Sequence, residues 1–95
     1  TQLFRIAQEA VNNAVVHAAA GKVEVELSAL NGTAALEIRD DGKGIREEDL
    51  RKESAGVRIM RYRASLLGGS LSIGPRTAGG TCVRCEIGTV SEGKE

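Results

Sequence analysis

Aromatic residues are scarce in this chain of 95 residues, which has one Phe, one Tyr and no Trp. A surface that stacks nucleic-acid bases on aromatic rings is therefore not expected. Thirteen basic residues balance thirteen acidic ones, so no net charge directs the chain toward nucleic acid or an anionic membrane. No apolar run approaches the ~18 residues of a membrane span, and no signal-peptide pattern is present, so we expect no direct membrane contact.

Histidine and cysteine are also scarce, which weakens any prediction of a zinc site. His17 has no second histidine with which to make a zinc-protease pair, and it suits the end of a helix as a cation. Cys82 and Cys85 have C-x-x-C spacing, but residues three apart in a strand point to opposite faces. We expect Cys85 to fill the core, in a reducing cytoplasm. The length fits one domain, placed at residues 1–90, with a flexible polar tail at 91–95.

An amphipathic helix is predicted over residues 1–20, where apolar residues recur at spacings of three and four. Thr1 is expected to cap its start and Gly21 to end it. The opposite face carries a row of polar residues four apart: Arg5, Glu9, Asn13 and His17. Glu9 and Asn13 offer the oxygen ligands that Mg²⁺ prefers. The alternative is a solvated face with an Arg5–Glu9 ion pair.

Two strands are predicted at residues 22–30 and 33–40, because apolar and polar residues alternate in both and an Asn-Gly pair joins them. The second strand ends in Asp40, the first residue of the run DDGKG. An ionised carboxylate only accepts hydrogen bonds, so Asp40 suits the exocyclic amine of adenine and disfavours guanine. Gly42 and Gly44 let the backbone lie close to a flat ligand. A charged hairpin turn is the alternative, whereas a calcium loop would need a different ligand spacing.

The second half of the chain is predicted to form a polar loop, a helix and a second hairpin. Residues 46–55 are almost all polar, and we expect either a lid over the site or a plain connector. Gly56 opens a predicted helix, whose free N–H groups suit a phosphate. A second hairpin is predicted at residues 70–73 and 81–87. Thr81 at its return either faces a phosphate or belongs to a simple glycine turn.

Four motifs follow one another along nearly the whole chain: QEAVNNAVVHA at 8–18, DDGKG at 40–44, GVRIMRYRASLLGG at 56–69 and GGTCV at 79–83. They resemble the N box, the two glycine boxes and the closing GT element of the ATP-binding catalytic domain of sensor histidine kinases. The RIMRYRA run followed by LLGG is similar to the subgroup of nitrate-responsive and desaturase-regulating kinases.

This resemblance implies an α+β fold, the Bergerat ATP-binding fold shared with gyrase B, MutL and heat-shock chaperone ATPases. In that two-layer α/β sandwich, helices cover one face of a mixed, mainly antiparallel sheet. By position, Glu9 resembles the residue beside the attacking group or water, and it shares the metal edge with Asn13, which resembles the Mg²⁺ ligand. Asp40 resembles the adenine partner. The remaining nucleotide contacts implied are Gly42, Gly44, Gly56 and Thr81.

The resemblance further implies a kinase that binds MgATP and donates its γ-phosphate to a histidine on a separate dimerisation domain of the same parent protein. A response regulator would act downstream, and the domain would be cytoplasmic, alone or as the cytoplasmic part of a membrane-bound sensor. Another ATPase of this fold, an anti-sigma-type serine kinase and a non-enzymatic α+β interaction module are the alternatives.

Three positions depart from the family pattern. Val16 stands where many relatives have a Lys or Arg near the phosphates, which removes one charge contact. Ser54 takes the place of a glycine that commonly ends the lid, and it is expected to stiffen that hinge. Ile59 replaces a glycine found in part of the subgroup.

Overall fold

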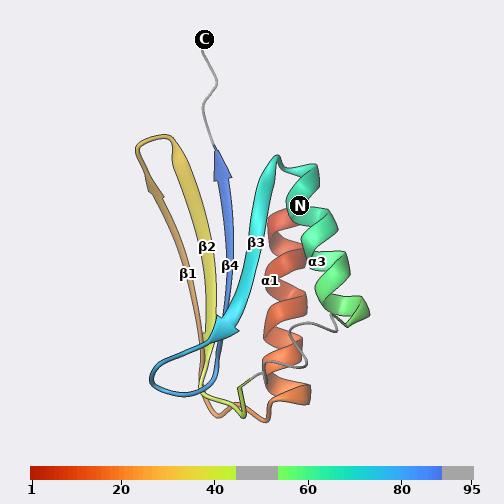
Figure 1. Cartoon of the computed structure of the whole chain (residues 1–95), viewed down its shortest axis with the longest axis vertical. Helices are drawn as coiled ribbons and strands as arrows, with labels where there is room; N and C mark the ends of the chain where they lie inside the picture. Colours follow the sequence, from red (N-terminus) through yellow and green to blue (C-terminus); the bar gives the residue numbers. More distant parts are fainter. Residues whose placement is uncertain (45–53, 89–95) are drawn as a thin grey trace.

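The computed structural model describes residues 1–44 and 54–88, which form a four-stranded sheet with helices on one face (Figure 1). The helices are α1 (Gln2–Asn12), continued by the short π-helix η1 (Asn13–His17), and α3 (Ala55–Leu66). The strands are β1 (Val23–Leu30), β2 (Thr33–Asp40), β3 (Gly69–Pro75) and β4 (Thr81–Gly88). Their order in the sheet is β1-β2-β4-β3, and all three pairings are antiparallel. The expected α+β fold is confirmed; residues 46–53 of the predicted lid and the predicted tail lie outside the described residues.

Both predicted hairpins form, and the register of the first decides which side chains face the helices. Asn31 and Gly32 join β1 to β2 with φ angles of 52° and 78°, as a tight hairpin turn requires. Ile38 pairs with Val83 of β4, and both side chains are buried. Because side chains alternate along a strand, Asp40 lies on the same face as Ile38, the face that the helices cover.

The first helix begins as predicted but ends earlier. Thr1 Oγ1 accepts a hydrogen bond from the Phe4 N–H at 3.2 Å, which confirms the cap. The regular helix stops at Asn12, and one wide π turn follows. The helix ends before Gly21: Ala19 takes a left-handed conformation with φ of 53°, and the Ala20 N–H donates a hydrogen bond to the Ala14 carbonyl at 2.9 Å. The prediction for Gly21 was therefore wrong. None of the described helices is long and apolar enough to cross a bilayer.

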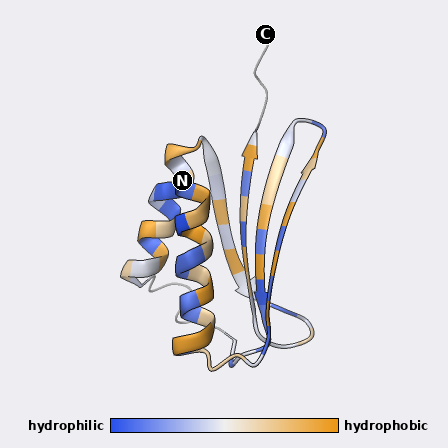
Figure 2. Cartoon of the chain, turned by 180° about the vertical axis from the view of Figure 1, so that it is seen from behind, coloured by the Kyte–Doolittle hydropathy of each residue, from blue (hydrophilic) through white to orange (hydrophobic). Residues whose placement is uncertain are grey.

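The core lies between the two layers. Its buried residues are Ile6, Ala10, Leu36, Ile38, Met60, Ala64, Leu71, Val83 and Cys85. Helix α1 packs on β2, while α3 packs on β3 and β4. Strand β1 extends beyond the helices, so Val25 and Leu27 remain 53% and 63% exposed although they lie on the helix side of the sheet. In Figure 2 apolar and polar residues alternate along the strands, as one covered face requires.

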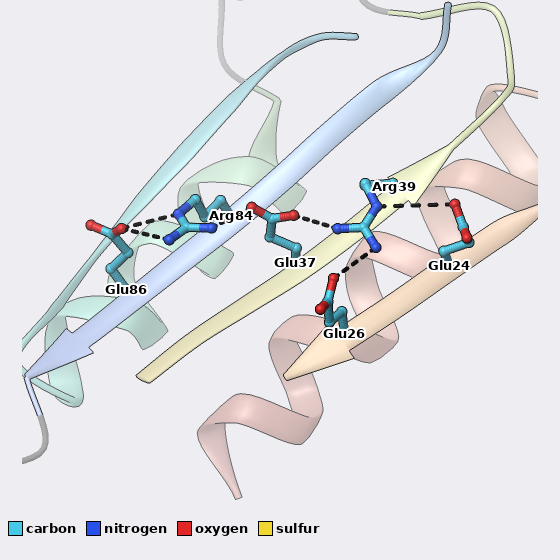
Figure 3. A network of polar contacts seen from close by, with 6 residues as sticks. All are labelled: Glu24, Glu26, Glu37, Arg39, Arg84 and Glu86. Atoms are coloured by element: carbon cyan, nitrogen blue, oxygen red, sulfur yellow. Dashed lines mark hydrogen bonds and ion pairs between the residues drawn. The ribbon is translucent and has the colours of Figure 1, made fainter. Parts of the chain in front are cut away.

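A network of six charged side chains covers part of the opposite face of the sheet (Figure 3). Arg39 pairs with Glu26 at 2.9 Å and with Glu37. Arg84 pairs with Glu86 at 2.8 Å and with Glu37. The hydrogen bond from Arg84, followed by that from Arg39, lowers the pKa of Glu37 below its ordinary value. This face is thus held by mutual ion pairs across three strands.

Candidate functional site

A cleft of about 820 Å³ opens between the helices and the end of the sheet at which β2 finishes and β4 begins. Its volume lies within the range of small-molecule sites, roughly 300–1,000 Å³. Every predicted site residue except Gly42 lines it: Glu9, Asn13, Asp40, Gly44, Gly56 and Thr81. The structure therefore brings together residues from four separate segments of the sequence.

Asp40 is the buried carboxylate of this cleft, only 6% exposed. Its Oδ1 accepts a hydrogen bond from the Gly42 N–H at 2.8 Å. Within residues 1–44 and 54–88, no group donates a hydrogen bond to Oδ2. A buried carboxylate oxygen without a donor is costly, so it is a strong acceptor for a ligand N–H. Thr81, the first residue of β4, lines the cleft at the same end of the sheet.

Glu9 and Asn13 bring two oxygen-bearing side chains from α1 and η1 to the cleft. Asn13 begins the π turn, in which its carbonyl accepts a hydrogen bond from the Ala18 N–H at 3.1 Å. Such turns occur frequently at functional sites. His17 also lines the cleft, whereas Arg5 does not, and the alternative Arg5–Glu9 ion pair is absent from the described part of the chain.

The start of α3 forms the wall opposite α1. A Cβ placed on Gly56 would lie 2.5 Å from Glu9 Oε2, so the glycine lets the Glu9 carboxylate sit against the first turn of α3. Ser54 caps this helix, because its Oγ accepts a hydrogen bond from the Val57 N–H at 3.2 Å. The departure from glycine at position 54 thus supplies a helix cap. Lys43, which sequence reasoning did not single out, places a cation at the same cleft.

The profile of the histidine kinase-, DNA gyrase B- and HSP90-like ATPase family matches residues 1–90 of this chain. The chain belongs to this ATPase family. Sensor histidine kinase LiaS of Bacillus subtilis is 35% identical over 92 residues, which cover 97% of this chain and 26% of that protein. The nitrate/nitrite sensor protein NarQ of Escherichia coli is 39% identical over 94 residues, which cover 98% of this chain and 16% of that protein. This chain therefore spans about a quarter or less of the length of these relatives.

Solved structures agree with this assignment. The histidine kinase domain of the Erythrobacter litoralis EL346 blue-light activated kinase matches with a TM-score of 0.77 and 29% identity, covering 93% of this chain and 43% of that one. The ATP-binding domain of PrrB from Mycobacterium tuberculosis shares the fold, with a TM-score of 0.83, 24% identity and coverage of 95% and 68%. The expected resemblance to sensor histidine kinases is confirmed.

Two neighbours of Asp40 shape the site of this ATPase-family domain without lining the cleft. Asp41 Oδ1 accepts hydrogen bonds from the N–H groups of Lys22 and Gly21, each at 2.9 Å. The bond from Lys22, and then that from Gly21, lowers the pKa of Asp41. A Cβ on Gly42 would lie 2.4 Å from the Ala18 carbonyl oxygen, so this glycine allows the loop to pack on the end of η1.

The two cysteines lie away from this chemistry. Cys85 is buried in the core, as predicted, while Cys82 lies on the opposite face of β4. Burial raises the pKa of both thiols. Cysteines on opposite faces of one strand do not form a shared C-x-x-C site.

Proposed function

We propose that this ATPase-family domain binds MgATP and presents its γ-phosphate to a histidine on a separate dimerisation domain of the same parent protein. The observation that carries the proposal is Asp40, a buried carboxylate with one oxygen to which no described group donates, in a cleft of about 820 Å³. An adenine amine supplies the missing donor, and guanine, with a carbonyl oxygen at that place, does not.

The residues of the helical wall fit Mg²⁺. This ion prefers oxygen ligands and takes only one or two from protein, with the rest from phosphates and water. Asn13, with its amide oxygen, and Glu9, with its carboxylate, would hold it at the cleft. The bound ion would offset the charge that develops on the transferring phosphoryl group. Glu9 would also stand beside the attacking group, and its place against Gly56 orients it toward the phosphate end of the cleft.

The start of α3 suits the phosphates. The Ser54 Oγ accepts a hydrogen bond from the Val57 N–H, and the Ser54 carbonyl accepts one from the Arg58 N–H. The N–H groups of Ala55 and Gly56 can therefore donate to a bound anion. Phosphoryl transfer depends on positioning and charge stabilisation, which the cleft supplies from rigid elements.

The acceptor histidine would come from outside this chain. His17 is the single histidine, and it lies on η1 as part of the wall of the cleft. The proposed transfer therefore places the acceptor on a helical dimerisation domain, with a response regulator downstream and the domain in the cytoplasm.

Calorimetry and a transfer assay together test this function. The domain is titrated with a non-hydrolysable ATP analogue with and without Mg²⁺, then mixed with the parent's histidine-bearing helical segment and γ-labelled ATP. The proposal expects binding and an acid-labile, base-stable label on the helical segment. Binding with phosphate released only to water would instead indicate another ATPase of this fold. Absence of binding would indicate an interaction module.

A further inference from the structure

Arg76 lies in the turn between β3 and β4, yet its side chain reaches the end of β2. Its Nη1 donates a hydrogen bond to the Asp40 carbonyl oxygen at 2.9 Å, in a partly buried position. The ladder between β2 and β4 ends one residue earlier, at the pair Arg39–Cys82. The guanidinium group thus donates to the Asp40 carbonyl at the point where the next backbone hydrogen bond from β4 would otherwise be expected.

The same turn also touches Asp40 through its backbone. Gly80 is buried with φ of 90°, and a Cβ there would lie 1.8 Å from the Asp40 carbonyl oxygen. The turn is closed by a hydrogen bond from the Arg76 N–H to the Gly80 carbonyl and by one from the Gly79 N–H to the Arg76 carbonyl, both at 3.0 Å. The same turn therefore packs its Gly80 backbone against the peptide group of Asp40 and donates a hydrogen bond to that group from Arg76.

We propose that Arg76 is a positioning residue for base recognition, a role that depends on the proposed function. It holds the main chain of Asp40 at the strand end and so fixes where the carboxylate lies in the cleft. Arg76 itself is not among the residues that line the cleft, so it acts through Asp40. Its bond goes to the carbonyl and not to the carboxylate, which leaves Oδ2 for the base. Loss of this bond should reduce the preference for adenine over guanine.

Four proteins test this role by calorimetry with MgATP and MgGTP: the wild type, Arg76→Met, Arg76→Lys and Arg63→Met. Methionine keeps the length of the chain but cannot donate. Arg63 makes a comparable hydrogen bond to Gln2 Oε1 at 2.9 Å, between α3 and α1, and does not line the cleft, so Arg63→Met is the matched control.

We expect Arg76→Met to weaken MgATP binding about tenfold while MgGTP binding changes little, so that the ratio of the two affinities falls by about the same factor. Arg76→Lys should restore part of the ratio, because an ammonium group can donate to the carbonyl. Arg63→Met should keep the wild-type ratio.

If Arg76→Met keeps the wild-type ratio of MgATP to MgGTP affinity, the proposal is overturned, even if the variant is less stable. A purely structural role would weaken the binding of both nucleotides equally. If Arg76→Met does not fold, Arg76→Ala, which also lacks a donor, decides in the same way: a reduced ratio of MgATP to MgGTP affinity supports the role and an unchanged ratio overturns it. A wild-type protein that does not bind MgATP would overturn the proposed function itself, before any variant is compared.

Discussion

Replacing Asp40 by Asn is the sharpest test of the base assignment, because the structure fixes how the new side chain sits. The Gly42 N–H donates to Oδ1 at 2.8 Å, and an asparagine keeps this bond only with its own oxygen at that place. Its NH₂ group then occupies the position of Oδ2, where it opposes the donor of an adenine amine. A mismatch between buried polar groups costs roughly 1–3 kcal/mol, so MgATP affinity should fall about 5- to 140-fold.

The matched control is Asp41→Asn, the same chemical change one residue along the chain. The Asp41 carboxylate accepts two backbone hydrogen bonds through Oδ1, and an amide oxygen can accept both. Because Asp41 does not line the cleft, Asp41→Asn should bind MgATP within about threefold of the wild type, less than ~1 kcal/mol. Calorimetry measures both affinities, and thermal unfolding reports whether each variant is folded.

For Asp40→Asn we expect the affinity for MgGTP to change in the opposite direction to that for MgATP. The asparagine NH₂ group can donate to the carbonyl oxygen of guanine, so MgGTP binding should strengthen while MgATP binding weakens. Unchanged MgATP affinity in Asp40→Asn, or equal losses in both variants, would refute the assignment of Asp40 as the adenine partner.

Three further substitutions address the metal edge, the start of α3 and the outer face of the sheet. Asn13→Ala should spare much of the nucleotide affinity but remove its dependence on Mg²⁺ in calorimetry; equal Mg²⁺ dependence in both proteins would contradict the metal role. Ser54→Ala should lower the free energy of unfolding by about 1 kcal/mol, since the Val57 N–H loses its cap. Glu37→Gln should cost less than about 1 kcal/mol near neutral pH. Since the folded-state pKa of Glu37 is lowered, this difference should shrink as the pH falls below the ordinary pKa of glutamate and vanish below the folded-state pKa, which denaturant titrations at a series of pH values can measure.

The helices and strands were predictable from the sequence because the spacing of apolar residues indicates which face of each element is buried. The alternation in β2 and the Asn31-Gly32 pair predicted the first hairpin with the bounds of β1 and β2 correct to within one residue. The pattern does not reveal how far a neighbouring layer extends, however. Val25 and Leu27 have the spacing of core residues but stay exposed, because the described helices do not cover this part of β1.

Irregular structure was less accessible. No hydrophobic periodicity encodes the π turn at η1, and the left-handed residue that follows it is Ala19. The contact between Arg76 and Asp40 joins residues 36 apart, and an arginine in a turn gives no sequence signal for it. The glycines before Thr81 indicated a turn there, but not which side chain it would bring to Asp40.

The candidate site occupies the points at which regular hydrogen bonding stops, and this explains both its chemistry and the difficulty of predicting it. Asp40 ends β2 beyond the last β2–β4 pair, Asn13 begins a π turn, and Gly56 lies in the first turn of α3, just after its Ser54 cap. Main-chain and side-chain groups at such points are left with hydrogen-bonding capacity that a nucleotide can use. Two-layer packing then holds these ends around one cleft, so the rigid sheet and helices supply position while their termini supply the contacts.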